Sequence, residues 1–195
     1  MTESEFFNLA KQGYNRIPVV LETFSDLDTP LSIYLKLANR PYSYLLESVR
    51  GGDRFGRYSF IGLPASTRIE VRGNCINIIS GQGSEQVGAE DPLSFIQSYL
   101  LRFKVAPCSG LPRFCGGLVG YFAYETVRYI ERKLADHVSS DSLDLPDMLL
   151  LLSEELIVVD NLSGKLYLII YTDPSIAGAY KETKKRLKVL LTNLR

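Results

Sequence analysis

Residues 68–79 alternate apolar and polar positions. Two short alternating runs, 68–72 and 75–79, flank Gly73-Asn74, a pair that favours a tight two-residue turn. This pattern predicts a β-hairpin. The next stretch, 81–88, contains glycine and polar residues, and we expect it to form a loop.

Longer apolar runs lie in the second half of the chain. Residues 148–159 predict a long strand or a strand pair, and 165–171 predict a further strand, joined by the turn residues 160–164. Because this second hairpin is apolar on both faces, we expect it to be buried in a sheet core. Residues 113–125 are expected to form a buried strand whose glycines let its backbone approach a neighbour closely.

A short helix is predicted to begin near residue 29. Thr29 is a typical N-cap, and Pro30 suits the first helical position. The following apolar residues recur at helical spacing and define one face. They are Leu31, Tyr34, Leu35 and Ala38.

Two further helices are predicted to begin at Asp-Pro pairs. Asp91-Pro92 precedes a periodic run that continues to Lys104, and Asp173-Pro174 precedes the last helix. Because the apolar stripe of that helix continues to the last residues without a cap, we expect residues 1–195 to be one domain truncated before another. The helix of 174–195 would lead towards that further domain. Its stripe consists of Leu187, Leu190, Leu191 and Leu194.

Composition places the chain among globular proteins, with 195 residues, 46% hydrophobic and 23% charged. The 22 basic and 22 acidic residues cancel, so no overall charge draws the chain to nucleic acid or to an anionic membrane. The acidic amino terminus does not match a secretory signal, and no apolar run is long enough to span a membrane. Three cysteines are too few for a disulfide scaffold, and we expect a cytoplasmic protein.

Candidate catalytic and metal-binding residues are few. His137, the only histidine, lies in a polar segment and is interpreted as a solvated side chain. Cys108, Cys115 and His137 lack the closely spaced ligand pairs of a zinc site. Glu154 and Glu155 would point to opposite faces of a strand and cannot act as a carboxylate pair. We therefore expect no catalytic residue, cofactor or metal in this chain.

Residues 44–62 give the strongest binding hypothesis. Two apolar runs, 44–49 and 58–61, flank a connector with three glycines and charges of both signs, which predicts a strand pair. The segment supplies the hydroxyl, carboxylate, cationic and aromatic groups that an amino-acid site needs. By composition alone, an ordinary half-buried hairpin is a better explanation of these groups than an amino-acid site. These residues are Ser48, Glu47, Arg50, Arg54, Arg57, Tyr44, Tyr58 and Phe60.

Four stretches resemble the amino-terminal domain of anthranilate synthase component I, a chorismate-utilising enzyme. They read Asp-Thr-Pro-Leu-Ser at 28–32, Tyr-Leu-Leu-Glu-Ser at 44–48, Gly-Arg-Tyr-Ser-Phe-Ile-Gly at 56–62 and Leu-Pro-Arg-Phe-Cys-Gly-Gly-Leu-Val-Gly-Tyr-Phe at 111–122. The resemblance extends from about residue 12 to the end of the sequence. It implies an α+β fold, a mainly antiparallel β-sheet sandwich with flanking helices.

The resemblance also implies a feedback site for L-tryptophan. In the family, the serine of the Leu-Leu-Glu-Ser motif lines the tryptophan pocket beside the two residues that precede it. A basic residue shortly downstream, with the residue after it, and a proline at the start of the preceding helix also belong to this region. On this sequence those positions are Leu46, Glu47, Ser48, Arg57, Tyr58 and Pro30.

Family members convert chorismate, with glutamine or ammonia, to anthranilate, and work with a glutamine amidotransferase subunit, component II. Their second domain holds the chorismate site, carboxylates that bind Mg²⁺ and a catalytic histidine. The resemblance therefore implies that this chain alone is inactive and holds no cofactor. The sequence departs from the family at two positions. Ala123 stands where family members often have glycine, and Cys115 stands where they often have a polar residue. Both departures concern the packing of a strand.

Two alternatives remain open. The same domain occurs in aminodeoxychorismate synthase, and only the product of the complete enzyme separates the two. A stand-alone module that binds a ligand or docks the amidotransferase subunit is the other alternative.

Overall fold

The computed structural model describes residues 1–25, 27–47, 56–134 and 143–195. The chain forms two compact units, each built on a five-stranded sheet. Unit 1 comprises residues 1–65, 103–117 and 153–195, and unit 2 comprises 66–102 and 118–152. Each unit is therefore assembled from segments far apart in the sequence.

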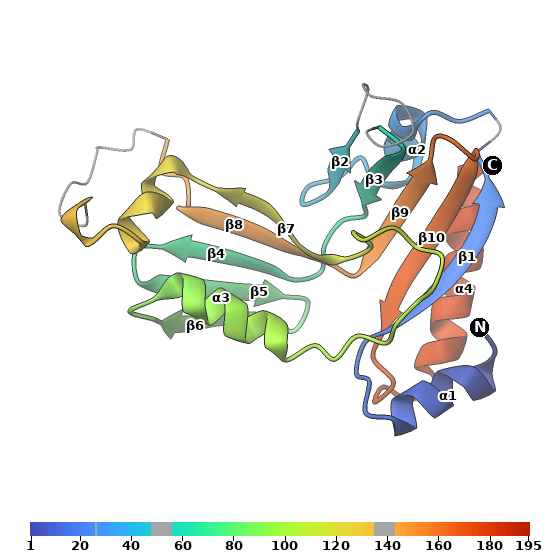
Figure 1. The fold of residues 1–195 in the computed structure, drawn as a ribbon, viewed down its shortest axis with the longest axis horizontal. Coiled ribbons are helices and arrows are strands. Elements are labelled where there is room, and N and C mark those ends of the chain that lie inside the picture. The colour runs from blue at the N-terminus through green and yellow to red at the C-terminus, as the bar shows by residue number, and fades with distance from the viewer. Residues whose placement is uncertain (26, 48–55, 135–142) are drawn as a thin grey trace. The chain divides into compact units, whose positions relative to one another are not determined.

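The sheet of unit 1 joins strands from both ends of the chain (Figure 1). Its order is β1-β10-β9-β3-β2, and every neighbouring pair is antiparallel. The predicted turn at 160–164 connects β9 and β10, as expected from the two apolar runs around it. The strands are β1 (Ile17–Phe24), β2 (Tyr44–Leu46), β3 (Tyr58–Gly62), β9 (Glu155–Asp160) and β10 (Lys165–Thr172).

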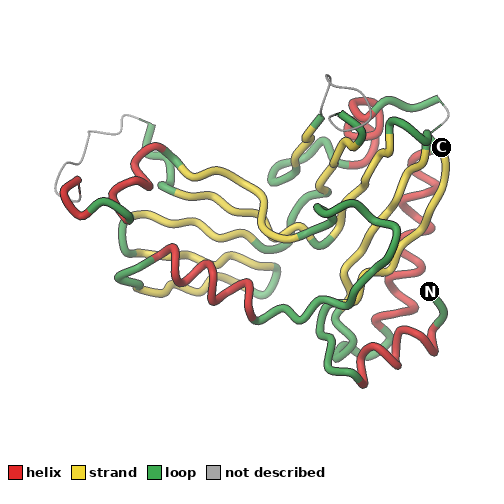
Figure 2. The backbone as a smooth tube through the Cα atoms, viewed as in Figure 1, coloured by secondary structure: helices red, strands yellow, loops and turns green. Residues whose placement is uncertain are grey.

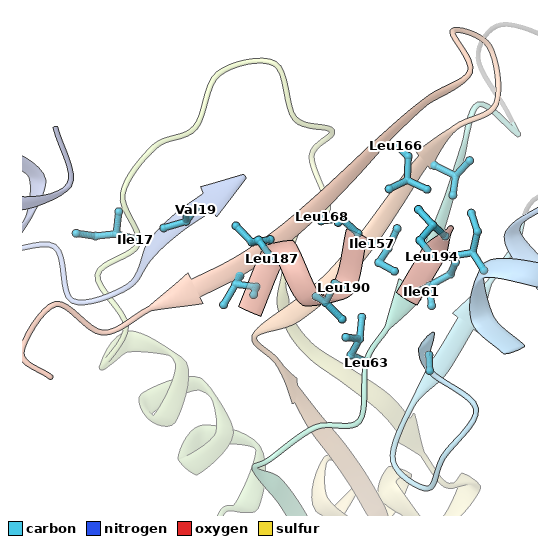
Figure 3. Close-up of a cluster of buried hydrophobic side chains, with 14 of the residues drawn as sticks. Ile17, Val19, Ile61, Leu63, Ile157, Leu166, Leu168, Leu187, Leu190 and Leu194 are labelled. Atoms are coloured by element: carbon cyan, nitrogen blue, oxygen red, sulfur yellow. The ribbon is translucent and has the colours of Figure 1, made fainter. Parts of the chain in front are cut away.

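Three helices, α1 (Glu3–Lys11), α2 (Pro30–Leu37) and α4 (Ala179–Leu194), bury side chains in the main core of unit 1. Alternate residues of the strands point into this core, while the stripe of α4 closes it (Figure 3). Three of the four predicted stripe leucines are buried. The residues visible in the close-up include Ile17, Val19, Ile61, Leu63, Ile157, Leu166, Leu168, Leu187, Leu190 and Leu194.

The opposite face of this sheet is covered by the segment 103–117 instead of a helix. In Figure 1 this yellow-green segment crosses one side of β9 and β10, and α4 lies on the other side. Phe114 and Leu111 pack there against Leu156, Val158 and Ile169. The prediction that β9 and β10 are buried on both faces is therefore confirmed.

Unit 2 contains the second sheet, in the order β6-β5-β4-β8-β7. The predicted hairpin at Gly73-Asn74 is confirmed, with Arg72 opposite Cys75. In Figure 2, α3 (Pro92–Leu101) lies in front of strands of this sheet, and η1 (Tyr124–Tyr129) and η2 (Arg132–Leu134) follow β7. The strands are β4 (Arg68–Arg72), β5 (Cys75–Ser80), β6 (Gly83–Gly88), β7 (Gly117–Phe122) and β8 (Met148–Ser153).

The loop predicted for residues 81–88 is wrong, because β6 pairs along its length with β5. Its side chains are mostly polar and exposed, so main-chain hydrogen bonds hold this edge strand and no apolar pattern marks it. The strand expected at 113–125 is also shorter, and it is not buried. In β7, the side chain of Phe122 is 53% exposed.

The helix starts at Thr29 and Asp91 are confirmed, and both residues cap their helices. The expected face of α2 is wrong in part, because Leu31 and Leu35 are exposed whereas Ile33 is fully buried. The last helix begins at Ala179 and not at Pro174. Its expected N-cap, Asp173, instead accepts hydrogen bonds from the backbone N–H and hydroxyl of Ser175 in a preceding turn. α3 ends at Leu101, three residues before the predicted end at Lys104.

Together these elements confirm an α+β fold with mainly antiparallel sheets and flanking helices.

Candidate functional site

The strand pair predicted within residues 44–62 is present in unit 1. β2 and β3 are antiparallel, with Leu46 opposite Phe60 and Tyr44 opposite Gly62. The strand β2 ends at Leu46, so Glu47 already lies outside it and is exposed. Ser48, from the end of the first predicted run, lies outside the described residues, as do Arg50 and Arg54 of the connector and His137.

Residues of β2 and β3 separate onto two faces. Leu45 and Ile61 point into the helix-covered core, whereas their neighbours Leu46 and Phe60 lie on the opposite face. Tyr58, two residues before Phe60, shares that opposite face. Leu46 is 47% exposed there.

Aromatic rings dominate the face that carries Leu46. Phe60 packs against Phe114 edge to face, with ring centroids 5.1 Å apart, and lies 6.3 Å from the Tyr58 ring. Phe114 comes from the segment that covers this face, and no pattern in the sequence predicts its contact with β3. The arrangement gives the Leu46 side of the strand pair an apolar, aromatic floor.

Arg57 forms a bidentate ion pair with Asp160, the last residue of β9. Its Nε and Nη2 atoms donate to the two carboxylate oxygens over 3.1 and 2.8 Å. The carboxylate is only 3% exposed and also accepts backbone N–H bonds from the following turn. The Arg57 guanidinium and these N–H donors lower the pKa of Asp160 to about 2. The guanidinium also lies over the Tyr58 ring, 4.9 Å from its centroid.

Asn161 fixes the backbone on either side of Arg57. Its main-chain N–H donates to the Arg57 carbonyl over 2.7 Å. Its side-chain amide donates to the Gly56 carbonyl and to the Ser59 hydroxyl, both over 3.1 Å. The sequence predicted only a turn at 160–164, so the role of Asp160 and Asn161 as anchors for β3 was missed. A sequence signal for this role is the Asp-Asn pair at the end of β9, together with an arginine directly before another strand.

Tyr44 lies across Gly62, its partner on β3. A Cβ atom at Gly62 would overlap the Tyr44 ring, so glycine is what allows the ring to lie there. The Tyr44 hydroxyl forms a 2.6 Å hydrogen bond with the hydroxyl of Ser153, which is buried. Burial raises the pKa of Tyr44. The tyrosine is therefore a fixed part of the strand pair, next to Leu46.

Pro30 occupies the first position of α2, behind the capping box that Thr29 and Ser32 form. This helix packs into the core on the opposite side of the sheet from Leu46 and Tyr58. The structure thus places Leu46 and Tyr58 on one face of the strand pair, with Arg57 directly before β3 and over the Tyr58 ring. Pro30 belongs to the helix that supports this pair from behind.

The other candidate groups have structural partners. Glu154 pairs with Arg16, and Glu155 pairs with Arg186, so the two carboxylates do not share a site. The hydroxyl of Tyr171 donates to the Cys115 thiol over 3.2 Å. Within the described ranges, no group of three or more His, Cys, Asp or Glu side chains could hold a metal ion, and no helix could cross a bilayer.

Comparisons with known proteins show which proteins this chain resembles over its length. Anthranilate synthase component 1 of Pseudomonas putida is 51% identical over 196 residues, and the match covers all of this chain. The protein of that name from Neisseria meningitidis strain FAM18 is 53% identical over 200 residues, and that from Acinetobacter calcoaceticus is 39% identical over 191. No family model matches the chain.

A solved structure supports the fold. Anthranilate synthase component I from Streptococcus pneumoniae TIGR4 aligns with a TM-score of 0.54 and 22% identity, over 86% of this chain and 35% of that one. At that identity the likeness concerns the fold alone. The chain spans about 40% of the length of the P. putida relative. Over its whole length, the chain is a homologue of the amino-terminal part of anthranilate synthase component I.

Proposed function

We propose that this chain is the amino-terminal, regulatory part of an anthranilate synthase component I. The observation that carries the proposal is 51% identity to the P. putida protein across the full chain. Such an enzyme, a lyase of tryptophan biosynthesis in the cytoplasm, converts chorismate and glutamine or ammonia to anthranilate and pyruvate. Because the chain spans about 40% of that relative, we assign the chemistry to the remaining length and expect the chain alone to be inactive.

The proposed role of the chain is to bind L-tryptophan as a feedback inhibitor near Ser48. Leu46 and Tyr58 supply an apolar and aromatic surface of the kind an indole ring needs. Arg57 uses two of its five N–H donors on Asp160, and its side chain remains 40% exposed. It is therefore available, directly or through water, to a ligand carboxylate. Glu47 would face the ligand's ammonium group.

Feedback needs two states of the complete enzyme that differ in affinity for tryptophan. Bound tryptophan would favour the state with the lower chorismate affinity, and chorismate would weaken tryptophan binding by the same factor. Coupling of this kind is typically about 1–3 kcal/mol, or roughly 5- to 150-fold in affinity. Pro30 would act from behind the sheet, through the packing of α2, and not as a direct ligand.

Tryptophan titration tests the binding site directly. The chain contains no tryptophan, so any indole fluorescence belongs to the ligand alone. We expect a saturable blue shift as the indole leaves water, and its loss in Ser48→Phe. Ser4→Phe is the matched control, because it adds the same ring at an exposed position of α1. A shift that both variants keep, or that both lose, would contradict the assignment of the site.

The remaining parts of the proposal concern partners. A glutamine amidotransferase subunit, component II, would supply ammonia, and Mg²⁺ would bind in the part of the enzyme outside this chain. Among the described residues, no group of three or more His, Cys, Asp or Glu side chains could hold a metal ion. The relatives named above are all anthranilate synthases, which favours this product over aminodeoxychorismate.

A further inference from the structure

A polar cavity of about 380 Å³ lies in unit 1, and no residue of β2 or β3 is among its lining residues. Its walls are the last turn of α2 with the residues that follow it, Pro64 after β3, and the second half of α4. Leu190, which is 3% exposed, contributes to its lining. The volume falls in the range of sites that hold small molecules, about 300–1,000 Å³.

The cavity is lined by cations and amides. Its polar side chains are Lys36, Asn39, Arg40, Arg186 and Asn193. No carboxylate is among the described residues that line it. The polar wall therefore offers hydrogen-bond donors and positive charge, which are the complement of an oxyanion.

Two of the three cations are already neutralised. Lys36 pairs with Asp28 over 2.9 Å and also donates to the Leu194 carbonyl over 2.7 Å. Arg186 pairs with Glu155 over 2.9 Å. These two pairs hold α2 and α4 in place without adding net charge to the cavity.

Arg40 is different. Its backbone N–H donates to the Ala38 carbonyl and its carbonyl accepts from Ser43. For its guanidinium, however, the described part of the chain offers no hydrogen bond or ion pair. The same holds for the side-chain amides of Asn39 and Asn193, on the two opposite walls. Asn39, Arg40 and Asn193 are all exposed residues, and together they give the cavity one unpaired positive charge and free donors.

Helix dipoles limit how tightly an anion could bind. The helix α2 ends beside the cavity, at Leu37, and the carbonyl end of a helix carries partial negative charge. The Lys36 ammonium, in the last turn of this helix, offsets part of this effect. A bidentate contact from one arginine then has to supply most of the attraction. We therefore expect weak binding.

From this arrangement we infer that the cavity binds a small metabolite through a carboxylate or phosphate group, with Arg40 as the primary contact. Asn39 and Asn193 would bind the anion or the polar groups next to it. The cavity shares no lining residue with the proposed tryptophan site. A negative result for one site therefore does not count against the other.

Amide NMR during anion titration tests the inference. The chain is titrated with inorganic phosphate and, separately, with succinate, each against chloride at constant ionic strength. We expect saturable shifts of the Arg40 Nε–H and of the Asn39 and Asn193 side-chain amides, at millimolar concentrations. Saturation by phosphate alone would identify a phosphoryl ligand, by succinate alone a carboxylate, and by both a general oxyanion site. Each of these outcomes supports the inference.

Three variants make the test specific. Arg40→Gln should weaken binding at least tenfold, because it removes the unpaired cation. Asn193→Asp should abolish it by placing a negative charge on the wall. Arg113→Gln, the matched control, removes an exposed arginine of unit 1 outside the cavity and should leave binding unchanged. Non-saturating shifts spread over all basic side chains, or an equal effect of Arg40→Gln and Arg113→Gln, would overturn the inference.

Discussion

Asp160 shows how one buried carboxylate can organise a strand end. It holds Arg57 through two hydrogen bonds and also caps the turn that follows it. A sequence reading recognises Asp and Asn in a turn but cannot tell which distant strand they will anchor, because the partner, Arg57, is 103 positions away. The pairing of Arg57 with Asp160 therefore had to come from the structure.

Stability should depend on the charge of Asp160. Its pKa is lowered to about 2 in the folded chain, whereas an unfolded Asp titrates near 3.9. The stabilisation is thus complete above about pH 4 and is lost as the pH falls towards 2. Because Arg57 is 40% exposed and solvent screens the pair, we expect a loss of about 1–2 kcal/mol.

Urea unfolding between pH 7 and pH 2.5 measures this dependence. Asp160→Asn should lower stability at pH 7 and flatten the acid part of the profile. Asp144→Asn serves as the control. Its carboxylate also pairs with an arginine, Arg72, but is 94% exposed, so solvent screens the pair and the profile should stay close to that of the original chain. If Asp160→Asn keeps the full acid dependence, the pair does not contribute as described.

Gly120 provides a second test at the scale of one residue. A Cβ at this position would overlap the carbonyl of Leu149 and lie 2.9 Å from the Cα of Leu150, both backbone groups of β8. Gly120→Ala should therefore force β7 away from β8 and cost about 1–3 kcal/mol. Gly81→Ala, where nothing lies within 4 Å of the added atom, should cost little. Thermal unfolding of both variants measures the difference. Equal melting temperatures would contradict the close approach of β7 to β8 at Gly120.

At the scale of elements, helix starts were more predictable than helix faces. Thr29 and Asp91 cap their helices as expected, because capping depends on residues adjacent in sequence. The face of α2 depends instead on which side the sheet and α4 cover. Its eight residues contain apolar side chains on several sides, so the periodicity alone could not distinguish Ile33 from Leu35.

Two truncations in α2 test the observed face. Ile33→Ala should destabilise the chain by about 2–4 kcal/mol, since the side chain is fully buried in the main core. Leu35→Ala should change stability by about 0.5 kcal/mol or less, because Leu35 is 56% exposed. Chemical denaturation of the two variants compares them directly. The reverse order of effects would restore the face predicted from the sequence.

The edge strand β6 could not be predicted from a local pattern. Strand prediction relies on apolar alternation, and β6 has almost none because most of its side chains are exposed. The hairpin before it and the buried strands β8 to β10 carry that alternation or long apolar runs, and they were predicted. Local patterns thus predicted the inner strands of the sheets better than the edges.

At the scale of the whole molecule, the resemblance in four motifs carried more information than composition did. It led to the same family as the comparisons. The division into two units was not predicted, because each unit combines segments that lie far apart in sequence. Periodicity describes neighbouring residues and contains no information about which segments assemble.

The proposed feedback site can be tested by one substitution in the longer enzyme. In a protein that joins this chain to the length its relatives contain, Ser48→Phe should abolish inhibition by tryptophan and leave kcat and KM for chorismate close to their original values. A bulky ring would fill the ligand space without reaching the chemistry. Steady-state assays with and without tryptophan measure this, with Ser4→Phe as the control. Unchanged inhibition in Ser48→Phe would contradict the proposed site.

The pairing of β1 with β10 has a consequence for how this protein is made. Ile17 at the start of β1 faces Thr172 in β10, and within the described sheet β1 has β10 as its neighbouring strand. At a synthesis rate of about 5–20 residues per second, the first strand waits roughly 8–30 seconds for its partner to be translated. Throughout that interval Ile17 and Val19 have no sheet to join. The nascent chain should therefore depend on chaperones that shield its amino-terminal segment until the last third of this sequence has emerged.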